Sequence, residues 1–370
     1  MTKRLRLKIS VIIVSYNCKA FLDYCLQSVS KALKPIDSEI IVIDNCSSDG
    51  SVEYLKSKKY DLKLIENKKN LGFSKANNKA AKLAKGEYLF FLNPDTIIPE
   101  DLIDSFFKNK KPNMGIFSFR MIDGEGIFLK ESKRNFPNIS VISKKLIGLN
   151  SGYYSDLGEF DSGNVDVLCG ANMIIDKSLF LDINGFNEEY FMFGEDIEIS
   201  HETFKKGYNN FYCGSSSIIH FKGESTVNDI NYLRSFYGAM HIYFKNVFST
   251  NPFLLGIIKI ILRLIIILSG ICPVKTKTRS KPNQNFLYGI KPNNRLEKIF
   301  GDILIIKKMD KTLKDCNLIF DSNFLTNKEI INYIDKFKNR NNINFWFLSS
   351  DYSYIIKSSG MNQKGNVIFL

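Results

Sequence analysis

Short apolar runs alternate with helix-like patterns over the first part of the chain. Apolar residues recur at helical spacing between the runs, as at Phe21, Cys25 and Val29, whereas the runs themselves are typical of buried strands. The pattern predicts strands at Ile9–Ser15, Glu39–Asp44, Leu62–Glu66 and Tyr88–Leu92, and helices at Ala20–Ala32, Val52–Lys58 and 70–83. Strands and helices in this order, with short connections, predict an α/β fold with a parallel sheet covered on both faces.

Polar residues at the ends of three predicted strands are candidates for a ligand site. Ligands of parallel sheets bind at the carboxyl ends of the strands. This rule selects Ser15–Asn17, Asp44–Asn45 and Asn93–Asp95. Asp49 and Gly50 follow in a turn-rich stretch, and we expect them to shape the turn.

The middle of the chain is less regular. From 106 to 165 the pattern weakens into loops rich in Gly and Asn, and we interpret this stretch as a variable region that reads the partner. Further along, the sequence predicts a segment at Val167–Asp176, a helix from Glu195 to Lys206 that Gly207 would end, and a strand at Ser216–His220.

A strongly apolar stretch lies between Pro252 and Pro273 and is interrupted by Lys259 and Arg263. These two cations make a membrane-spanning helix costly, so we rank a helix that docks on the membrane first, a buried helix second and a span last. The basic residues at 275–281 would suit anionic headgroups. The remainder, 282–370, is predicted to be a small α/β extension with strands at Ile303–Ile306, Leu318–Asp321, Asn344–Leu348 and Val367–Leu370 and a helix at Lys328–Lys338.

Composition narrows the classes of function. The 370 residues carry a formal net charge of +13, and the lysines are spread along the chain. Because no basic-aromatic block or zinc-ligand spacing occurs, we predict no nucleic-acid partner. The seven scattered cysteines indicate a reducing compartment with buried thiols. The apolar run near the N-terminus has the length of a strand and lacks a cleavage site, so we expect no signal peptide.

Seven motifs, in this order, resemble the family 2 glycosyltransferases of the GT-A fold, and among them the rhamnosyltransferase-like branch. They are VIIVSYN (11–17), VIDNCSSDGS (42–51), NLGFSKANN (70–78), FLNPD (91–95), CGANMIID (169–176), NGFNEEYFMFGEDIEIS (184–200) and IIHFKGEST (218–226). The resemblance implies a Rossmann-like GT-A domain at 1–248, followed by the apolar and basic segment 249–281 and the extension 282–370. It also implies inverting transfer of a sugar from a nucleotide-sugar to a hydroxyl group, with a divalent metal, Mn²⁺ or Mg²⁺, as cofactor.

The resemblance assigns a nucleotide-binding role to residues of the first motifs. It places a base-reading carboxylate at Asp44, which as a plain structural residue would cap a helix or close a turn. Caps and turns explain the other candidates almost as well, although glycine permits close backbone approach to a ligand. The full set of candidate donor-binding residues is Ser15, Asn17, Asp44, Asn45, Asn70, Gly72, Asn77, Asn93, Gly170 and Ala171.

The candidate metal ligands are Asp95 and His220. An oxygen-bound divalent cation neutralises the charge that develops on a diphosphate leaving group. Most GT-A enzymes use Asp-x-Asp here, but this chain has Asn93-Pro94-Asp95, as the resembling branch does. With one carboxylate instead of two, we expect metal affinity to be modest and to depend on the bound nucleotide. His201 and His241 match no motif.

The candidate catalytic base is Asp196, with Glu195 as the alternative. Single-displacement inversion needs a base opposite the leaving group, which takes the proton of the acceptor hydroxyl. The resemblance assigns this base to the second residue of the acidic pair. The structural alternative is that the acidic residues only complement the positive end of a helix.

We therefore predict a glycosyltransferase that adds one sugar per encounter in the synthesis of a surface polysaccharide. The donor would be a pyrimidine nucleotide-sugar such as dTDP-rhamnose or a UDP-sugar, and the acceptor a glycan or a sugar on a polyprenyl diphosphate. The location would be cytoplasmic, at the inner face of the membrane. The alternatives are a nucleotidyltransferase, although Val11–Lys19 lacks glycine, and a scaffold that binds nucleotide-sugars without catalysis.

Overall fold

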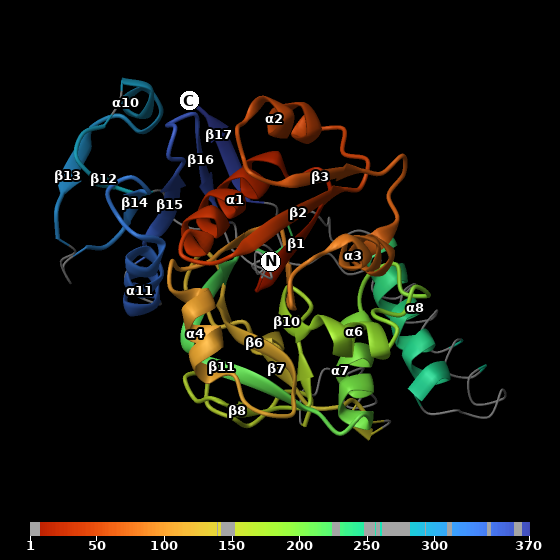
Figure 1. Cartoon of the computed structure of the whole chain (residues 1–370). Helices are drawn as coiled ribbons and strands as arrows, with labels where there is room; N and C mark the ends of the chain where they lie inside the picture. The colour runs from red at the N-terminus through yellow and green to blue at the C-terminus, as the bar shows by residue number, and fades with distance from the viewer. Residues whose placement is uncertain are drawn as a thin grey trace, which may run out of the picture.

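The structure is a computed structural model that describes residues 8–138, 140–141, 152–223, 230–247, 256, 260, 282–292, 294–308, 313–338, 342–358 and 365–370. Within these residues, two large sheets and a two-stranded ribbon carry the fold, and helices pack on the sheets (Figure 1).

The larger sheet has the strand order β3-β2-β1-β4-β10-β6-β11-β5, with β8 paired to β11. Its strands are β1 (Ile9–Ser15), β2 (Ser38–Asp44), β3 (Lys63–Glu66), β4 (Tyr88–Leu92), β5 (Thr96–Ile97), β6 (Met114–Ile122), β8 (Gly163–Asn164), β10 (Asn172–Asp176) and β11 (Asn209–His220). The strands from β3 to β4 are parallel, as predicted. The prediction of a parallel sheet is wrong beyond β4, because β10 runs antiparallel to both β4 and β6. The sheet is therefore mixed.

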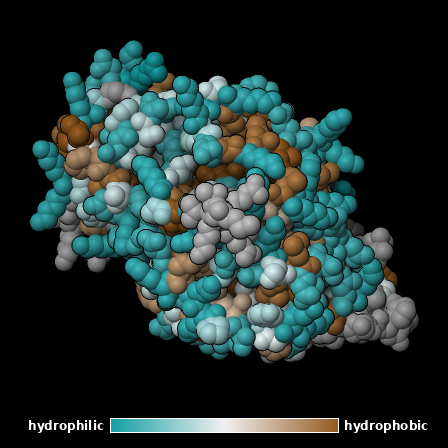
Figure 2. All heavy atoms as spheres, viewed as in Figure 1, coloured by the Kyte–Doolittle hydropathy of each residue, from teal (hydrophilic) through white to brown (hydrophobic). Residues whose placement is uncertain are grey.

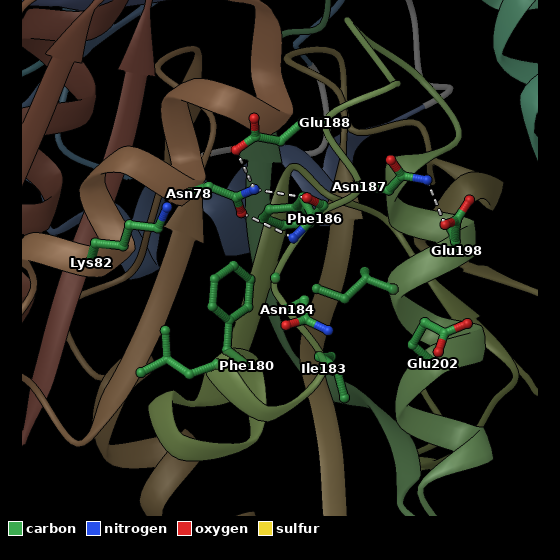
Figure 3. A pocket seen from close by; sticks show the side chains of 13 residues that line it. Asn78, Lys82, Phe180, Ile183, Asn184, Phe186, Asn187, Glu188, Glu198 and Glu202 are labelled. Atoms are coloured by element: carbon green, nitrogen blue, oxygen red, sulfur yellow. Dashed lines mark hydrogen bonds between the residues drawn. The ribbon is translucent and has the colours of Figure 1, made fainter.

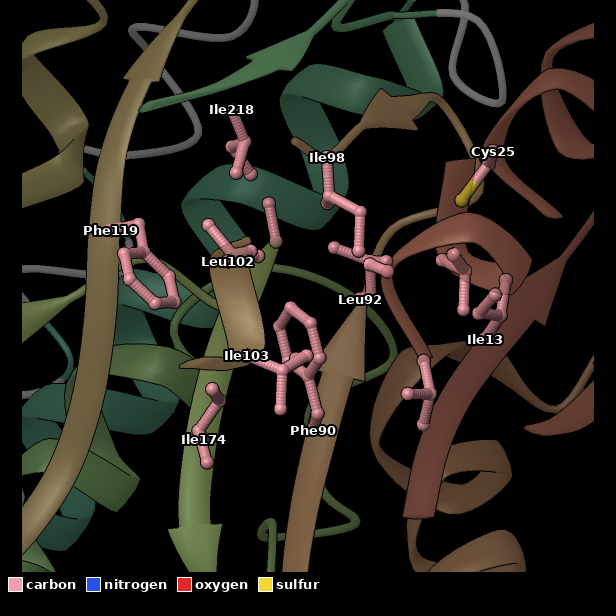
Figure 4. Close-up of a cluster of buried hydrophobic side chains, with 14 of the residues drawn as sticks. Ile13, Cys25, Phe90, Leu92, Ile98, Leu102, Ile103, Phe119, Ile174 and Ile218 are labelled. Carbon is pink, nitrogen blue, oxygen red and sulfur yellow. The ribbon is translucent and has the colours of Figure 1, made fainter. Parts of the chain in front are cut away.

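Helices cover both faces of this sheet, as the apolar periodicity predicts. They are α1 (Lys19–Leu33), α2 (Ser51–Ser57), α3 (Gly72–Leu83), α4 (Leu102–Asn109), α6 (Lys177–Asp182), α7 (Glu195–Lys205) and α8 (Ile230–Val247), with a 3₁₀ turn η1 (Lys130–Ser132). On one face, α1 and α4 bury Leu22, Leu102 and Ile103 against the strands (Figure 4). On the other face, α3, α6 and α7 bury Ala76, Phe180 and Ile199. The sheet is thus the middle of three layers.

Strand β6 lies in the stretch that we expected to consist of variable loops, so this expectation is wrong for Met114–Ile122. Every residue of the strand after Met114 is buried, including Ser118 and Arg120. The polar pair interrupts the apolar run from which a buried strand is recognised. The region predicted as one segment at Val167–Asp176 is divided into β9 (Val167–Leu168), which pairs with β7 (Lys133–Arg134), and β10.

The second sheet belongs to the predicted extension and has the order β13-β12-β14-β15-β16-β17. Its elements are β12 (Gln284–Tyr288), α10 (Asn294–Phe300), β13 (Ile303–Ile306), β14 (Cys316–Asp321), α11 (Asn327–Phe337), β15 (Asn344–Leu348), β16 (Tyr354–Lys357) and β17 (Asn366–Phe369). The strands from β13 to β15 are parallel, and β16 and β17 are antiparallel additions. An α/β extension is therefore confirmed.

The extension packs against α1 and the adjoining end of the larger sheet (Figure 1). One apolar cluster combines Phe21 and Phe221 of the first unit with Phe347 of the second, with ring centroids 5.1 Å apart in the pairs Phe21–Phe221 and Phe221–Phe347. Arg120, with no exposed surface, donates to both carboxylate oxygens of Asp335 at 3.2 and 2.8 Å. The two units therefore share one core.

The predicted membrane-docking helix at 252–273 lies outside the described residues, apart from Gly256 and Ile260, which are helical. The basic residues at 275–281 also lie outside them. Among the helices that the structure describes, none is both long enough and apolar enough to cross a bilayer. The domain boundaries at 248 and 282 stay predictions.

Candidate functional site

The loop after β2 is held against the loop after β1 by hydrogen bonds. The backbone N–H groups of Asn17 and Lys19 donate to Ser47 Oγ at 3.0 Å and to Asp49 Oδ2 at 2.9 Å. In return, Ser48 N–H donates to Asn17 Oδ1 at 2.7 Å. Asn17 adopts a left-handed backbone, with φ 50°, which asparagine tolerates better than most residues. These contacts bring the first two candidate regions together at one edge of the sheet.

Asp44 lies at this edge with only one of its two carboxylate oxygens engaged. Its Oδ2 accepts from Ser47 N–H at 2.8 Å, the turn contact that the structural alternative requires. Its Oδ1 is buried and has no hydrogen-bond partner among the described residues. A buried oxygen of this kind costs free energy unless a ligand satisfies it. The geometry therefore leaves an acceptor for a ligand N–H at Asp44.

The other candidates near this edge mostly support the loops. Asn45 is buried and donates to Gly72 O at 3.1 Å, while its Oδ1 accepts from Asn67 at 2.9 Å. Asn70 Oδ1 accepts from Gly72 N–H at 2.9 Å. Two further contacts complete this set, namely Asn77 Nδ2 with Phe73 O at 3.1 Å and Ser15 Oγ with Cys18 Sγ at 3.5 Å. For these residues the structure shows positioning contacts.

Gly72 is required by a close backbone approach at the start of α3. Its φ is +77°, and a Cβ atom would lie 2.3 Å from Phe191 O. In the same place, Phe73 N–H donates to Phe191 O at 2.7 Å. Glycine therefore allows the loop of residues 184–194, which leads into α7, to lie against the start of α3.

Asn93, Asp95 and His220 come together as predicted. His220 Nε2 lies 3.3 Å from Asp95 Oδ1 and 3.4 Å from Asn93 Nδ2. The main chains of this group are also tied, since Phe221 N–H donates to Asp95 O at 2.9 Å. Asp95 Oδ1 and His220 Nδ1 are buried without a hydrogen-bond partner in the described structure. The pair therefore keeps polar atoms available.

These atoms fit one divalent cation that relies on further ligands. A carboxylate oxygen and an imidazole nitrogen 3.3 Å apart can coordinate the same ion, and this mixed donor set suits Mn²⁺ better than Mg²⁺. Among the described residues, no group of three or more His, Cys, Asp or Glu side chains is placed to hold a metal. Oxygens of a nucleotide diphosphate would have to complete the coordination.

Asp196 lies in the first turn of α7 and is held by Arg134. Arg134 donates from one guanidinium nitrogen to Asp196 Oδ2 at 2.5 Å, and Gly170 N–H donates to the same oxygen at 3.3 Å. Burial opposes the charge of Arg134, but the Asp196 carboxylate together with Tyr153 and Cys169 outweighs burial and keeps the pKa of Arg134 well above its usual value. Both hydrogen bonds end on Oδ2, so Asp196 is fixed in orientation through one oxygen.

Glu195 occupies a different environment one residue earlier. It is buried, and its Oε2 has no hydrogen-bond partner among the described residues. Burial and the neighbouring Asp196 carboxylate raise the pKa of Glu195 to about 8. The acidic pair is therefore divided, with Asp196 held by a cation and Glu195 inclined to keep its proton at neutral pH.

A short chain of contacts connects the metal candidates with the acidic pair. Asn93 N–H donates to Ala171 O at 3.0 Å, and the neighbouring Gly170 contacts Asp196. A Cβ atom on Gly170 would lie 3.4 Å from the Asp196 Cβ and equally near the Phe73 ring. Gly170 and Ala171 therefore join the carboxyl ends of the strands to α7 by close backbone approach, and all the candidate residues share one edge of the sheet.

Sequence reasoning missed Arg134 and the pair formed by Glu131 and Lys222. Lys222 Nζ lies 2.5 Å from Glu131 Oε1. Burial works against ionisation of Glu131, but Lys222 outweighs it and lowers the pKa of Glu131, with a smaller contribution from His220. Lys222 stood in the motif IIHFKGEST beside His220 and could have been selected. Arg134 and Glu131 lie in the stretch interpreted as variable and carried no signal.

A cavity of about 540 Å³ lies elsewhere (Figure 3). It opens between α3, α6 and α7, with Asn78 and Lys82 on one side and Glu198 and Glu202 on the other. None of the predicted site residues lines it. The candidate site is therefore an edge of the sheet with unpartnered polar atoms, separate from this cavity.

Residues 10–183 match the sequence profile described as Glycosyl transferase family 2. Residues 10–183 are thus a glycosyl transferase family 2 segment. The α/β fold with its mixed central sheet is accordingly the GT-A fold that the motifs implied. The family 2 segment contains Asp44, Asn93 and Asp95, whereas the acidic pair and His220 follow it.

Two curated relatives illustrate the range of proteins to which this chain is similar. Poly(ribitol-phosphate) beta-glucosyltransferase of Bacillus spizizenii is 31% identical over 149 residues, which are 38% of this chain and 24% of the relative. N-acetylglucosaminyl-diphospho-decaprenol L-rhamnosyltransferase of Mycobacterium tuberculosis is 24% identical over 250 residues, which are 59% of this chain and 78% of the relative. The chain thus spans less than a quarter of the first relative.

One solved structure is the mannosyltransferase PcManGT from Pyrobaculum calidifontis in complex with GDP-Man and Mn²⁺. It aligns with a TM-score of 0.47 and 17% identity, and the alignment covers 72% of each chain.

Proposed function

We propose that this family 2 protein is an inverting glycosyltransferase that moves one sugar from a nucleotide-sugar to an acceptor hydroxyl. The observation that carries the proposal is the shared edge of the sheet. There, Asp44, Asp95 and Glu195 each keep a buried oxygen that has no hydrogen-bond partner among the described residues, and backbone contacts through Gly170 and Ala171 join Asn93 to Asp196. Unpaired acceptors of this kind are costly in a protein that binds nothing.

Asp196 acts as the general base in this proposal. Arg134 holds its Oδ2, which fixes the direction of the carboxylate. The proton of the acceptor hydroxyl passes to Asp196 while the acceptor oxygen bonds to the anomeric carbon. The bond from that carbon to the diphosphate breaks, and the diphosphate leaves with the electron pair. Glu195, which retains its proton at neutral pH, donates a hydrogen bond to the sugar or the acceptor.

Asp95 and His220 hold the divalent cation, with Asn93 beside them. When bound, the cation supplies Lewis-acid stabilisation of the negative charge on the leaving diphosphate. Asp44 Oδ1 accepts the imide N–H of a uracil or thymine base, so the donor is a UDP- or dTDP-sugar. Ser15, Asn17, Asn45, Asn70, Gly72 and Asn77 position the loops around that donor, and Gly170 and Ala171 approach the sugar.

The acceptor is a glycan or a sugar on a polyprenyl diphosphate, used in cell-surface polysaccharide synthesis at the cytoplasmic face of the membrane. Two curated relatives support this class, since their names specify a poly(ribitol-phosphate) and a diphospho-decaprenol acceptor.

Thermal unfolding with and without nucleotides tests the donor site. We expect UDP or dTDP with Mn²⁺ to raise the melting temperature, because a ligand that binds only the folded state stabilises it. Asp95→Ala should abolish the part of the shift that depends on Mn²⁺, and Asp44→Ala should abolish the preference for UDP and dTDP over GDP. Asp321→Ala, in the extension, is the control. Equal shifts in all variants would contradict the proposal.

A further inference from the structure

The free edge of the second sheet combines exposed apolar side chains with lysines. Four large apolar side chains are exposed within sixteen residues: Ile290 by 71%, Leu304 by 54%, Ile305 by 44% and Ile299 by 41%. They come from the loop after β12, from α10 and from β13, which is an edge strand of its sheet. Figure 2 shows hydrophobic surface at the left end of the molecule, where Figure 1 places β13, with hydrophilic surface around it.

Cations outnumber acids around these side chains. The exposed charged residues between 290 and 308 are Lys291, Arg295, Lys298, Lys307 and Lys308, against Glu297 and Asp302. Arg295 donates to Leu370 O, whereas the four lysines form no ion pair within the described parts of the chain. We call this surface, residues 290–308, the β13 edge.

We propose that the β13 edge docks on an anionic lipid surface. Exposed apolar side chains can enter the headgroup region of a bilayer while neighbouring lysines bind anionic headgroups. Burying such side chains in the bilayer also removes the penalty of exposing them to water. The inference gives the extension a role, and it rests on the proposed function only because a lipid-linked acceptor would lie at the same membrane.

The charge pattern favours a lipid surface over a second copy of the chain. In a symmetric dimer, the same patch faces itself, so its five exposed cations and two exposed acids would meet an equal excess of positive charge on the partner copy. Like charges that face each other across paired strands are destabilising. An anionic membrane instead supplies the opposite charge along the whole edge.

Sedimentation with lipid vesicles tests the proposal without donor or acceptor, so its outcome is independent of sugar transfer. We expect the full chain to sediment with phosphatidylcholine vesicles that contain phosphatidylglycerol and to stay in solution with phosphatidylcholine alone. The double variant Lys307→Gln with Lys308→Gln should weaken vesicle binding roughly 30-fold, because each lysine near the surface raises the affinity about fivefold. Leu304→Ser with Ile305→Ser should also weaken binding, with an unchanged thermal transition as evidence of folding.

The matched control is Lys68→Gln with Lys69→Gln, an adjacent exposed lysine pair on the first unit. It should leave vesicle binding unchanged. Equal losses in both lysine pairs would show attraction by the overall charge of +13 and would overturn the β13 edge as a specific site. The proposal also fails if the protein does not bind anionic vesicles, or if Leu304→Ser with Ile305→Ser only abolishes self-association in analytical ultracentrifugation.

Discussion

Carboxylates lie at the carboxyl ends of parallel strands in both sheets of the molecule, but their surroundings differ. In the larger sheet, Asp44 and Asp95 each keep one buried oxygen to which none of the described residues hydrogen-bonds. In the second sheet, Asp321 accepts from Asn323 N–H at 2.9 Å with one oxygen and from Tyr352 at 3.0 Å with the other. Asp351 likewise accepts from Ser349, Ser353 and Lys58.

The two sheets differ in what contacts the carboxyl ends of their strands. The carboxyl edge of the second sheet lies against α1, where Gln27 accepts from Ser350 N–H at 3.2 Å and Lys31 donates to Ser322 O at 3.0 Å. A protein element thus takes the place that a ligand takes in many open α/β sheets. Position at the end of a strand is therefore insufficient evidence for a site, and the unpartnered oxygens supply what is missing.

Asp196→Asn should have the largest effect on the first unit. We expect transfer or donor hydrolysis to fall by about 10²–10⁴-fold, the range for loss of a general base. The matched variant in the second sheet is Asp321→Asn, which should lower the melting temperature but leave turnover per folded molecule unchanged. Activity of Asp196→Asn close to that of the wild type would remove Asp196 from the role of base.

Asp335→Asn should have the largest effect on the junction of the two units. It leaves the buried Arg120 with Glu159 at 3.3 Å as its remaining anionic partner. We expect a loss of about 3 kcal/mol in the free energy of unfolding, the lower end of the range for a broken buried pair. Urea unfolding should show a single transition at lower denaturant, because the units share one core.

The control for this variant is Asp101→Asn. Asp101 forms an exposed ion pair with Lys328, also across the junction, at 2.6 Å. Exposed pairs contribute about 0–1 kcal/mol. Equal losses in Asp335→Asn and Asp101→Asn would show that burial of Arg120 does not determine the strength of the junction.

Elements bounded by clear turn residues could be predicted from the sequence, as Tyr88–Leu92 and Ile303–Ile306 show, with bounds that agree with the structure. Strand β6 could not, because the charge of Arg120 is neutralised by Asp335, 215 residues away. The short strands β12 and β16 were also missed, since QNFLY and YIIK contain polar residues and lack a long apolar run.

For the site, strand ends and motifs predicted the region but not which atoms are free. Asn45 and Asn70 both hydrogen-bond to the backbone of Gly72, and no local pattern predicts that Asn45 does so across 27 positions of the chain. Arg134 escaped prediction because its partner Asp196 is brought near by the pairing of β7 with β9. Local sequence patterns therefore predict where the site lies, whereas contacts between distant segments determine the chemical environment of its residues.

Glu195 and Asp351 should contribute to the pH dependence of stability with opposite signs. The pKa of Glu195 is raised to about 8, so the folded state holds a proton that the unfolded state loses above its ordinary pKa of 4.5. Stability should therefore fall as the pH rises from 4.5 to about 8. Glu195→Gln, neutral in both states, should flatten this dependence in urea unfolding at about pH 5 and about pH 9.

Asp351 provides the contrast. Burial opposes its ionisation, but hydrogen bonds from Lys58 and the neighbouring serines outweigh burial and lower the pKa of Asp351 below its ordinary 3.8. Its contribution should be present above that value and lost as the pH falls below it. Asp351→Asn should therefore change stability below about pH 4. Between pH 5 and 9 it should not alter how the free energy of unfolding changes with pH. If Glu195→Gln leaves the pH dependence of the free energy of unfolding unchanged, Glu195 does not hold its proton at neutral pH beside Asp196.

Tyr354→Phe should have a small effect and tests whether the extension influences the carboxyl edge of the larger sheet. Tyr354 donates to Asp23 Oδ2 at 2.6 Å, while Tyr60 and Gln27 also donate to this buried carboxylate, both at 2.7 Å. Because two donors remain, we expect a loss of about 1.5 kcal/mol in urea unfolding, the low end for a hydrogen bond to a charged group. Turnover and the KM for the donor should not change. If the KM rises more than the stability falls, the extension shapes the nucleotide loop through α1, and the two edges form one functional unit.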